Sequence, residues 1–245
     1  RFANKTTFIY VLTFFIFVKN NIRENFMSGF LNSTIGRKYA MALSAMFLLV
    51  FLVMHLSLNM VSVFSEEAFN EGSHFMESNP LVQKIMQPIL MFAVIFHFVM
   101  GFVLEAKNKK ARPIAYAVSG ASANSTWMSR NMMISGGLIL IYLLIHLVDF
   151  WVPTISKNYL GGESNGTAYE HLRHQFGALW RVVLYLVSFV LLGLHLSHGF
   201  QSSFQSIGAR HPKYTPCIQS FGKWYAILVP VGFAIVAIFH YVSQS

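Results

Sequence analysis

Apolar residues occur along this chain in long runs that charged residues rarely interrupt. Five of these runs are long enough, at about 20 residues each, to cross a hydrocarbon core about 30 Å thick as a helix. They occupy residues 39–64, 85–104, 132–151, 177–200 and 224–241. Because lipid cannot hydrogen-bond the backbone, each run must be helical. The pattern therefore predicts an all-α fold, a single membrane-embedded bundle of five transmembrane helices.

The composition agrees with a membrane protein. Of the residues, 55% are hydrophobic and 11% charged, whereas about 25% of an ordinary soluble domain is charged. These values exclude a soluble enzyme. The formal net charge of +9 is not concentrated in a basic motif. We therefore expect the basic residues to set the orientation in the membrane and to form a docking face for a protein partner, and we expect no nucleic acid to bind.

Basic residues mark one side of the predicted bundle. They precede the first span and lie in the connections after the second and fourth spans, at Arg37, Lys38, Lys107, Lys109, Lys110, Arg112, Arg210, Lys213 and Lys223. The connection after the first span is acidic instead. Because cytoplasmic connections carry an excess of Lys and Arg, we expect the amino terminus inside and the carboxyl terminus outside.

The segment before Met27 is set apart from the rest. Its apolar stretch from Phe8 to Val18 is short for a span. It is interpreted either as a leader or as the product of a start assigned upstream of Met27, which leaves residues 27–245 as the five-helix domain.

The connections and prolines complete the prediction. The acidic connection after the first span is expected to be a solvated loop, and the Gly-, Ser- and Asn-rich connection after the third a turn-filled one. Pro88 and Pro230 are expected to kink the second and fifth spans, and Pro153 to end the third.

Four of the apolar runs each carry a histidine, namely His55, His97, His146 and His195. An ionisable side chain inside the hydrocarbon region is costly unless it faces a partner or a cofactor. Neutral imidazole is a strong ligand for iron, and two opposed imidazoles can fill both axial positions of a haem. Four such histidines on four helices therefore suggest two haems.

The depth of each histidine predicts how the four are paired. Successive helices alternate in direction, so His55 and His146, late in the outward-running first and third spans, lie in the outer half of the membrane. His97 and His195, late in the inward-running second and fourth spans, lie in the inner half. We call these the outer pair and the inner pair.

Small or polar residues follow three of the four histidines. The residue four positions after a histidine shares its helix face, and these residues are Gly101, Gly199 and Asn59. A glycine there leaves room for a flat macrocycle. His146 is followed by Phe150 instead. The only cysteine is Cys217, which excludes a CxxCH haem attachment. Both haems would be non-covalent, of b type.

Two further residues on the fourth span are candidates for haem contacts. His198 shares a face with His195 but is nearer the inside surface. It is an alternative ligand, or it forms a hydrogen bond to a propionate or simply to a backbone carbonyl. Arg181 shares the face of His195 about four helical turns away, so it either pairs with a propionate or extends toward lipid headgroups.

The remaining histidines are interpreted without haem. A lone membrane histidine such as His240 is expected to be a hydrogen-bonded packing residue. His171 and His174 have HxxH spacing, which can hold a metal, but further ligands are not close to them in the sequence.

Several motifs between and around these histidines give the chain a family resemblance. The most specific are STIGRKYAMALSAMF, FNEGSHFMESNPLVQ, HFVMGFVLEAKNKKARP, SRNMMISGG and GLHLSHGFQSSFQSIG. From Met27 to its end the chain resembles the five-helix, di-haem cytochrome b subunit of succinate dehydrogenases and fumarate reductases, of the b558 type. In that family the ligands pair between helices one and three and between two and four.

This resemblance implies a function in electron transfer. The chain would be the membrane anchor of a bacterial cytoplasmic-membrane complex, docking a flavoprotein subunit with FAD and an iron–sulfur subunit on the inner face. Electrons from succinate would reach menaquinone through the inner and then the outer haem, or flow in reverse for fumarate reduction. The chain itself supplies no dicarboxylate chemistry.

Quinone reduction also needs protons, and polar residues on the outer side can relay them. The outer residues are Glu66, Glu67, Asn70, His74 and Asp149. Of these, Glu66, Glu67 and His74 are the candidate proton groups beside the outer haem; the alternative is a solvated loop without such a role. Two other functions remain open from the sequence: a di-haem anchor of a hydrogenase or formate dehydrogenase, and a non-haem di-iron membrane enzyme.

Overall fold

The computed structural model describes residues 33–110, 130–159 and 166–244, and the segment before Met27 lies outside them. In the described part the chain is all-α, with five helices long and apolar enough to cross a membrane. The predicted fold class is thus confirmed. The first, fourth and fifth are α3 (Thr34–Phe64), α11 (Leu179–Ser206) and α12 (Thr215–Val242). A division into two compact units falls inside α3 after Ala40, and the packing below belongs to Met41–Ser245.

The second and third spans each contain a π-helical turn. In the second, η1 (Val82–Met86) leads into α5 (Gln87–Lys110). In the third, α8 (Met132–His146) continues through η2 (Leu147–Trp151) into α9 (Val152–Tyr159).

All five spans are longer than the apolar runs that predicted them. The second continues to Lys110 instead of ending at residue 104, and the fifth begins at Thr215 instead of residue 224. These boundaries were wrong because a helix satisfies its own backbone hydrogen bonds and does not stop where hydrophobicity stops.

The expectation that Pro153 ends the third span was wrong. The helix continues through it to Tyr159. Pro88 and Pro153 are each the second residue after a π turn, where the backbone N–H of Gln87 bonds Val82 and that of Val152 bonds Leu147, five residues back. Each π-helical hydrogen bond comes just before the proline. The proline, which has no backbone N–H, then lies in the first turn of the following α-helix, where proline is tolerated.

The two outer connections were predicted as loops and are largely helical in their described parts. α4 (Glu66–Ser78) begins at Ser65, whose hydroxyl accepts from the N–H of Ala68, and its first turn carries Glu66 and Glu67, which suit the positive end of the helix dipole. α10 (Ala168–Phe176) begins with a capping box of Thr167 and Glu170. Local capping thus made helices of segments whose polar composition suggested loops.

The bundle is held together by contacts between its long helices. α11 packs against both α12 and α8, and α8 packs against α5. The hydroxyl of Tyr225 on α12 donates to the carbonyl of Leu49 on α3 at 2.6 Å. A Cβ on Gly193 of α11 would lie 3.0 Å from the carbonyl oxygen of Ala226, so glycine permits the close approach of α11 and α12.

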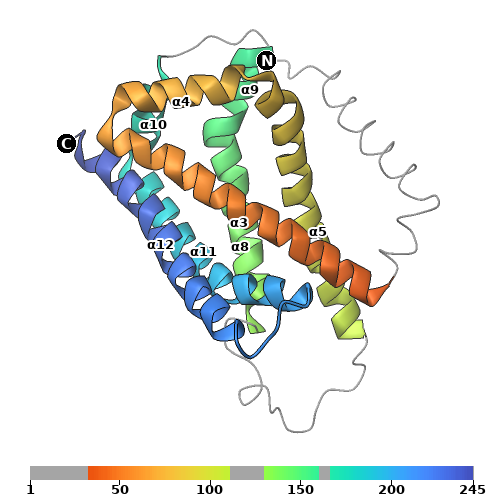
Figure 1. Cartoon of the computed structure of the whole chain (residues 1–245). Coiled ribbons are helices and arrows are strands. Elements are labelled where there is room, and N and C mark those ends of the chain that lie inside the picture. The colour runs from red at the N-terminus through yellow and green to blue at the C-terminus, as the bar shows by residue number, and fades with distance from the viewer. Residues whose placement is uncertain (1–32, 111–129, 160–165, 245) are drawn as a thin grey trace. The chain divides into compact units, whose positions relative to one another are not determined.

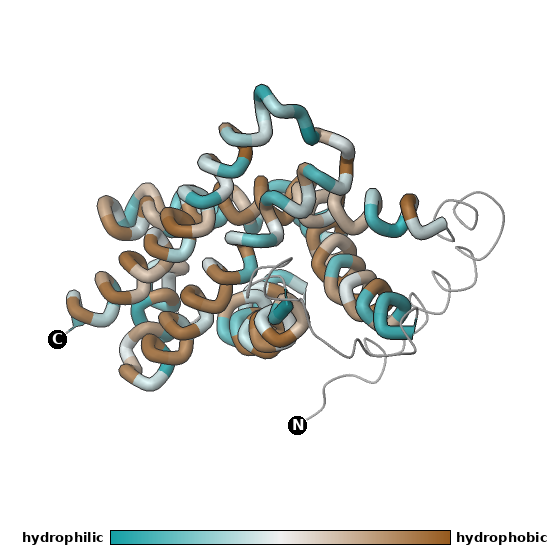
Figure 2. The backbone as a smooth tube through the Cα atoms, turned by 90° about the horizontal axis from the view of Figure 1, so that it is seen from below, coloured by the Kyte–Doolittle hydropathy of each residue, from teal (hydrophilic) through white to brown (hydrophobic). Residues whose placement is uncertain are grey.

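Many side chains on the outer faces of the long helices are apolar and exposed, among them Val50, Val187 and Ile227. Hydrophobic residues run along these helices, as the brown segments of the tube show (Figure 2). A surface of this kind is normal against lipid and would be exceptional against water.

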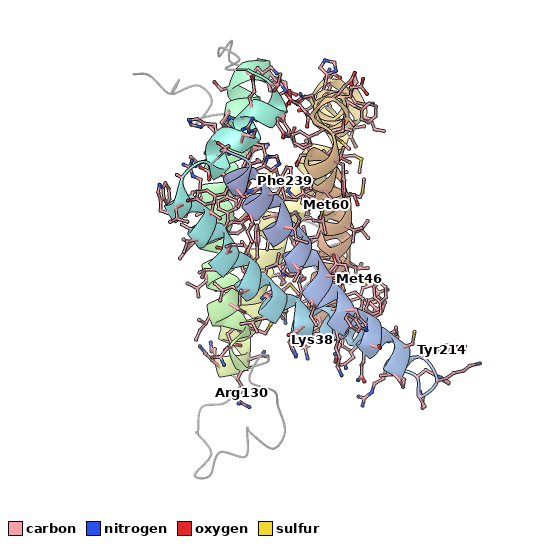
Figure 3. The ribbon with its side chains drawn as sticks, turned by 90° about the vertical axis from the view of Figure 1, so that its left-hand side faces the viewer. Lys38, Met46, Met60, Arg130, Tyr214 and Phe239 are labelled. Carbon is pink, nitrogen blue, oxygen red and sulfur yellow. The ribbon has the colours of Figure 1, made fainter. Side chains whose placement is uncertain are left out.

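The direction of the helices decides the depth of each residue. Met60, late in α3, and Phe239, late in α12, lie near one another at one end, whereas Arg130, ahead of α8, and Tyr214, ahead of α12, lie toward the opposite end (Figure 3). α4 runs across the end at which α3 finishes and the second span begins (Figure 1). The first, third and fifth spans thus point toward the α4 end, and the second and fourth point away from it.

Candidate haem sites

The four spanning histidines meet as two pairs. In the outer pair, the ring centres of His55 on α3 and His146 at the end of α8 are 5.8 Å apart, with the ring planes at 85°. In the inner pair, His97 on α5 and His195 on α11 have ring centres 6.3 Å apart and planes at 72°. The structure therefore brings together the same histidines that the depth argument paired.

These separations suit two imidazoles on opposite sides of one metal ion. An imidazole nitrogen binds a first-row metal at about 2.0–2.1 Å, and the ring centre lies about 1 Å behind that nitrogen. Two opposed ligands therefore have ring centres about 6 Å apart. Both pairs are close to this value.

The Nε2 atoms of the four histidines are free to bind a metal. Within the described residues, no hydrogen bond involves the Nε2 atom of any of the four histidines. The Nδ1 atoms of the inner pair each have a serine neighbour: Ser44 lies 3.4 Å from His97, and Ser135 lies 3.3 Å from His195. A partner on the second nitrogen is typical of histidines that bind metals.

Three glycines on α5, α8 and α11 have little beside the position that a Cβ would take. A Cβ added to Gly137 on α8 would meet nothing within 4 Å among the described residues, and one on Gly101 or Gly199 would meet only a methionine methyl, at 3.7 Å and 3.9 Å. Methionine side chains are flexible and can move aside. Gly101 and Gly199, expected from the sequence to leave room for a macrocycle, thus have few atoms beside them.

The outer pair lies in an aromatic environment. His55 stacks on Phe51 with ring centres 5.2 Å apart and also contacts Phe233 at 5.6 Å. His146 is surrounded by the rings of Tyr142, Phe150 and Tyr185, whose centres lie 5.2–6.1 Å from its own. The Nδ1 of His146 is buried without a hydrogen-bond partner in the described structure. Aromatic surfaces of this kind suit the faces and edges of a macrocycle.

The donor set, the ring separations and the free Nε2 atoms fit two haems with two histidine ligands each. In the described residues no group of three or more His, Cys, Asp or Glu is placed to hold a metal ion. The imidazoles come in pairs, which is the number of axial protein ligands in a six-coordinate haem of the cytochrome type.

His198 and Arg181 have different surroundings. His198 is half-buried, one turn beyond His195 on α11. Arg181 is engaged by protein groups: its guanidinium forms an ion pair with Asp149 at 3.4 Å, donates to the Gln175 side chain and lies over the Trp180 ring. A haem propionate would therefore have to compete with Asp149 for the Arg181 guanidinium.

A buried polar network surrounds Asp149, which is only 6% exposed. The Tyr185 hydroxyl donates to its carboxylate at 2.8 Å, and Arg181 pairs with the other carboxylate oxygen. The backbone carbonyl of Asp149 lies 2.8 Å from Nε2 of His171 and accepts from Gln175 at 3.2 Å. This network joins η2, α10 and α11 one turn beyond His146.

Sequence reasoning placed Asp149 on the outer side but missed this network. The available signal was an acidic residue within an apolar run, which is rare without a partner. Its partners could not be read from the sequence, because Arg181 and Tyr185 lie on another helix.

The three candidate proton groups, Glu66, Glu67 and His74, all lie exposed on α4 and will be called the α4 polar set. Asn70, on the same helix, accepts from the backbone N–H of Tyr169 at 2.9 Å and so ties α4 to α10. Asp149 is the buried member of the outer residues.

His240 is the packing residue that the sequence predicted. Its side chain is fully buried, and its Nε2 lies 2.8 Å from the hydroxyl of Ser62 on α3. Of the HxxH residues, His171 belongs to the Asp149 network and His174 is exposed.

One comparison with known proteins gives a similarity. The chain is 25% identical over 191 residues to the succinate dehydrogenase cytochrome b558 subunit of Bacillus subtilis, covering 77% of this chain and 86% of that protein. No family model matches the chain, and no solved structure matches it. The similarity supports the relationship to succinate dehydrogenase cytochrome b subunits that the sequence motifs indicated.

Proposed function

We propose that this chain is the membrane anchor and di-haem cytochrome b subunit of a succinate:quinone oxidoreductase. The observation that carries the proposal is the meeting of four histidines from four spanning helices as two isolated pairs. The similarity to the Bacillus subtilis cytochrome b558 subunit supports it independently.

Each pair would hold one b haem between two helices. His55 and His146 would be the axial ligands at the outer site, and His97 and His195 those at the inner site. A bound b haem supplies one-electron transfer at its iron. The helices supply ligands at fixed positions, an apolar and aromatic environment that excludes water, and a path for electrons across the membrane.

The partners follow from the same assignment. A flavoprotein subunit with FAD and an iron–sulfur subunit would dock on the inner face, where the described basic residues include Lys107, Lys109, Lys110 and Lys223. The complex would lie in a bacterial cytoplasmic membrane with the amino terminus of this chain inside. As an electron-transfer subunit, the chain would act without a dicarboxylate site of its own.

Menaquinone would react near the outer haem site. The α4 polar set lies at that end of the bundle on a helix exposed to water, and protons for quinone reduction can pass through carboxylate or imidazole groups at such a boundary. Asp149 places a further buried carboxylate one turn from His146.

A second candidate is the di-haem anchor of another respiratory enzyme, such as a hydrogenase or formate dehydrogenase. It would use the same histidine pairs. The similarity to a succinate dehydrogenase subunit favours the first function. A non-haem di-iron enzyme is less suited, because among the described residues no group of three or more His, Cys, Asp or Glu is placed to hold a metal ion.

The test is the composition of the complex purified through this chain. We expect a flavoprotein and an iron–sulfur subunit, two b haems per chain by the pyridine haemochrome assay, and haem reduction on addition of succinate. His97→Ala should remove the inner haem, and His55→Ala the outer one. One haem or none in the intact complex would refute the di-haem assignment. Two haems with hydrogenase or formate dehydrogenase subunits would support the second candidate.

A further inference from the structure

Two serines on neighbouring helices contact the inner pair in the same way. Ser44 on α3 lies 3.4 Å from Nδ1 of His97 on α5, and Ser135 on α8 lies 3.3 Å from Nδ1 of His195 on α11. In both contacts the serine oxygen meets Nδ1, the ring nitrogen nearer the histidine backbone. The outer pair has no such contact in the described residues.

The proton in each contact can be assigned from the other hydrogen bond of the serine. The Ser44 hydroxyl donates to the carbonyl of Met41 at 2.8 Å, and the Ser135 hydroxyl donates to that of Met132 at 3.2 Å. A hydroxyl has one proton, so each serine oxygen can only accept from the imidazole. Nδ1 must then carry the ring proton, and the lone pair of the neutral ring lies on Nε2.

We propose that Ser44 and Ser135 are positioning residues for the inner haem, each fixing its histidine in the tautomer and orientation that present Nε2 to the iron. This inference rests on the proposed function and concerns the inner site alone. Partners on the second ring nitrogen orient histidine ligands and raise their basicity. The two serines therefore set how strongly the inner ligands favour ferric over ferrous iron.

The spacing of the residues on α3 and α8 supports a built arrangement. Ser44 precedes His55 by eleven positions, and Ser135 precedes His146 by eleven positions. Eleven residues are about three helical turns, so the serine and the histidine lie on one face of each helix, about 16 Å apart along its axis. α3 and α8 thus each direct a ligand to the outer site and a serine to the inner ligands.

His240 provides a contrast within the same protein. The Ser62 hydroxyl donates to the carbonyl of Asn59 at 2.6 Å and so accepts from His240, but here the ring nitrogen is Nε2, at 2.8 Å. This contact occupies the nitrogen that a ligand would use, and His240 is a packing residue. In the inner pair, by contrast, the serines contact Nδ1 and leave Nε2 without a hydrogen bond to the described residues.

The experiment measures each haem in the purified complex after serine substitution. The inner haem is first identified as the component lost in His97→Ala. Ser44→Ala and Ser135→Ala are then compared with Ser44→Thr and Ser135→Thr, which keep the hydroxyl. The matched control is Ser197→Ala, which removes a serine of α11 whose hydroxyl donates to the carbonyl of Leu194 at 2.7 Å and, among the described residues, makes no hydrogen bond to a histidine of the two pairs.

We expect the alanine variants to raise the midpoint potential of the inner haem and change its low-spin paramagnetic resonance signal. Substitution of a residue that hydrogen-bonds a metal-binding histidine changes metal affinity about 10–100-fold. A tenfold loss of preference for the ferric form raises a one-electron potential by about 59 mV. The outer haem, the threonine variants and Ser197→Ala should keep wild-type values.

Unchanged inner-haem potential and resonance signal in the double alanine variant would overturn the inference while leaving the proposed function intact. An equal shift of both haems would also overturn it. If the alanine variants do not assemble, the threonine variants decide. Assembly with wild-type potentials supports the role of the hydroxyl, and their failure to assemble contradicts it. A wild-type complex without two haems would instead refute the proposed function.

Discussion

Tyr185 and Asp149 form the buried contact whose energetic effect the structure predicts most directly. The Tyr185 hydroxyl donates to the Asp149 carboxylate at 2.8 Å, and both side chains are buried. Tyr185→Phe removes only the hydroxyl and keeps the ring that packs against His146 and Phe189. The carboxylate would then retain the ion pair with Arg181, at 3.4 Å, as its remaining side-chain partner.

The expected loss follows from the kind of hydrogen bond. A bond to a charged group contributes about 1.5–3 kcal/mol in soluble proteins, whereas the largest couplings measured between membrane helices are about 1.7 kcal/mol. We therefore expect Tyr185→Phe to reduce the free energy of unfolding by about 1–2 kcal/mol, which is about 5–30-fold in the unfolding equilibrium constant. Loss of the Asp149 side chain should cost more, because Arg181 would be left partly buried and without its ion-pair partner.

The assay is equilibrium unfolding of the purified complex in mixed micelles, with a double-mutant cycle between Tyr185→Phe and Asp149→Asn. The matched control is Tyr142→Phe, because Tyr142 packs on Tyr185 and His146 but its hydroxyl makes no hydrogen bond to the described residues. We expect a coupling energy of about 1–2 kcal/mol and a control within about 0.5 kcal/mol of wild type. A coupling energy near zero would refute the reasoning, since distant, independent sites add within about 0.3–0.5 kcal/mol.

Three further predictions concern the ligands, the quinone side and the packing. His195→Ala should abolish the low-spin paramagnetic resonance signal of the inner haem, whereas His198→Ala should leave two low-spin haems; the opposite result would transfer the ligand role to His198. Substitution of the α4 polar set and Asp149→Asn should lower succinate-to-quinone turnover in at least one variant while succinate-to-dye turnover is kept; full quinone activity in every variant would place the quinone site elsewhere. Gly193→Leu should destabilise the complex by about 1–3 kcal/mol in thermal unfolding, because even a Cβ there lies 3.0 Å from the Ala226 carbonyl oxygen; unchanged stability would show that α11 and α12 can separate without cost.

The sequence alone determined the class of fold and the candidate ligands. Charge-poor apolar runs predict spanning helices because lipid leaves the backbone no other way to satisfy its hydrogen bonds. Depth follows from the alternating direction of the helices and the regular rise per residue. This was enough to pair His55 with His146 and His97 with His195, the pairs that meet in the structure.

Helix ends and connections depended on local chemistry that hydrophobicity does not report. The polar composition of α4 and α10 predicted loops. The prediction did not consider that Ser65 and Thr167 can cap a helix, which both do in the structure. Pro153 was predicted to end a helix because the π turn before it is invisible in the apolar pattern.

Only the tertiary structure decided which polar side chains meet across helices. Asp149 finds Arg181 and Tyr185, and the inner ligands find Ser44 and Ser135, through the rotation of each helix about its own axis. The spacing of eleven residues was present in the sequence, but a serine that faces a histidine and one that faces lipid look the same there. Rotation is set by packing against neighbouring helices, and in an apolar run almost every face is hydrophobic enough to point toward lipid.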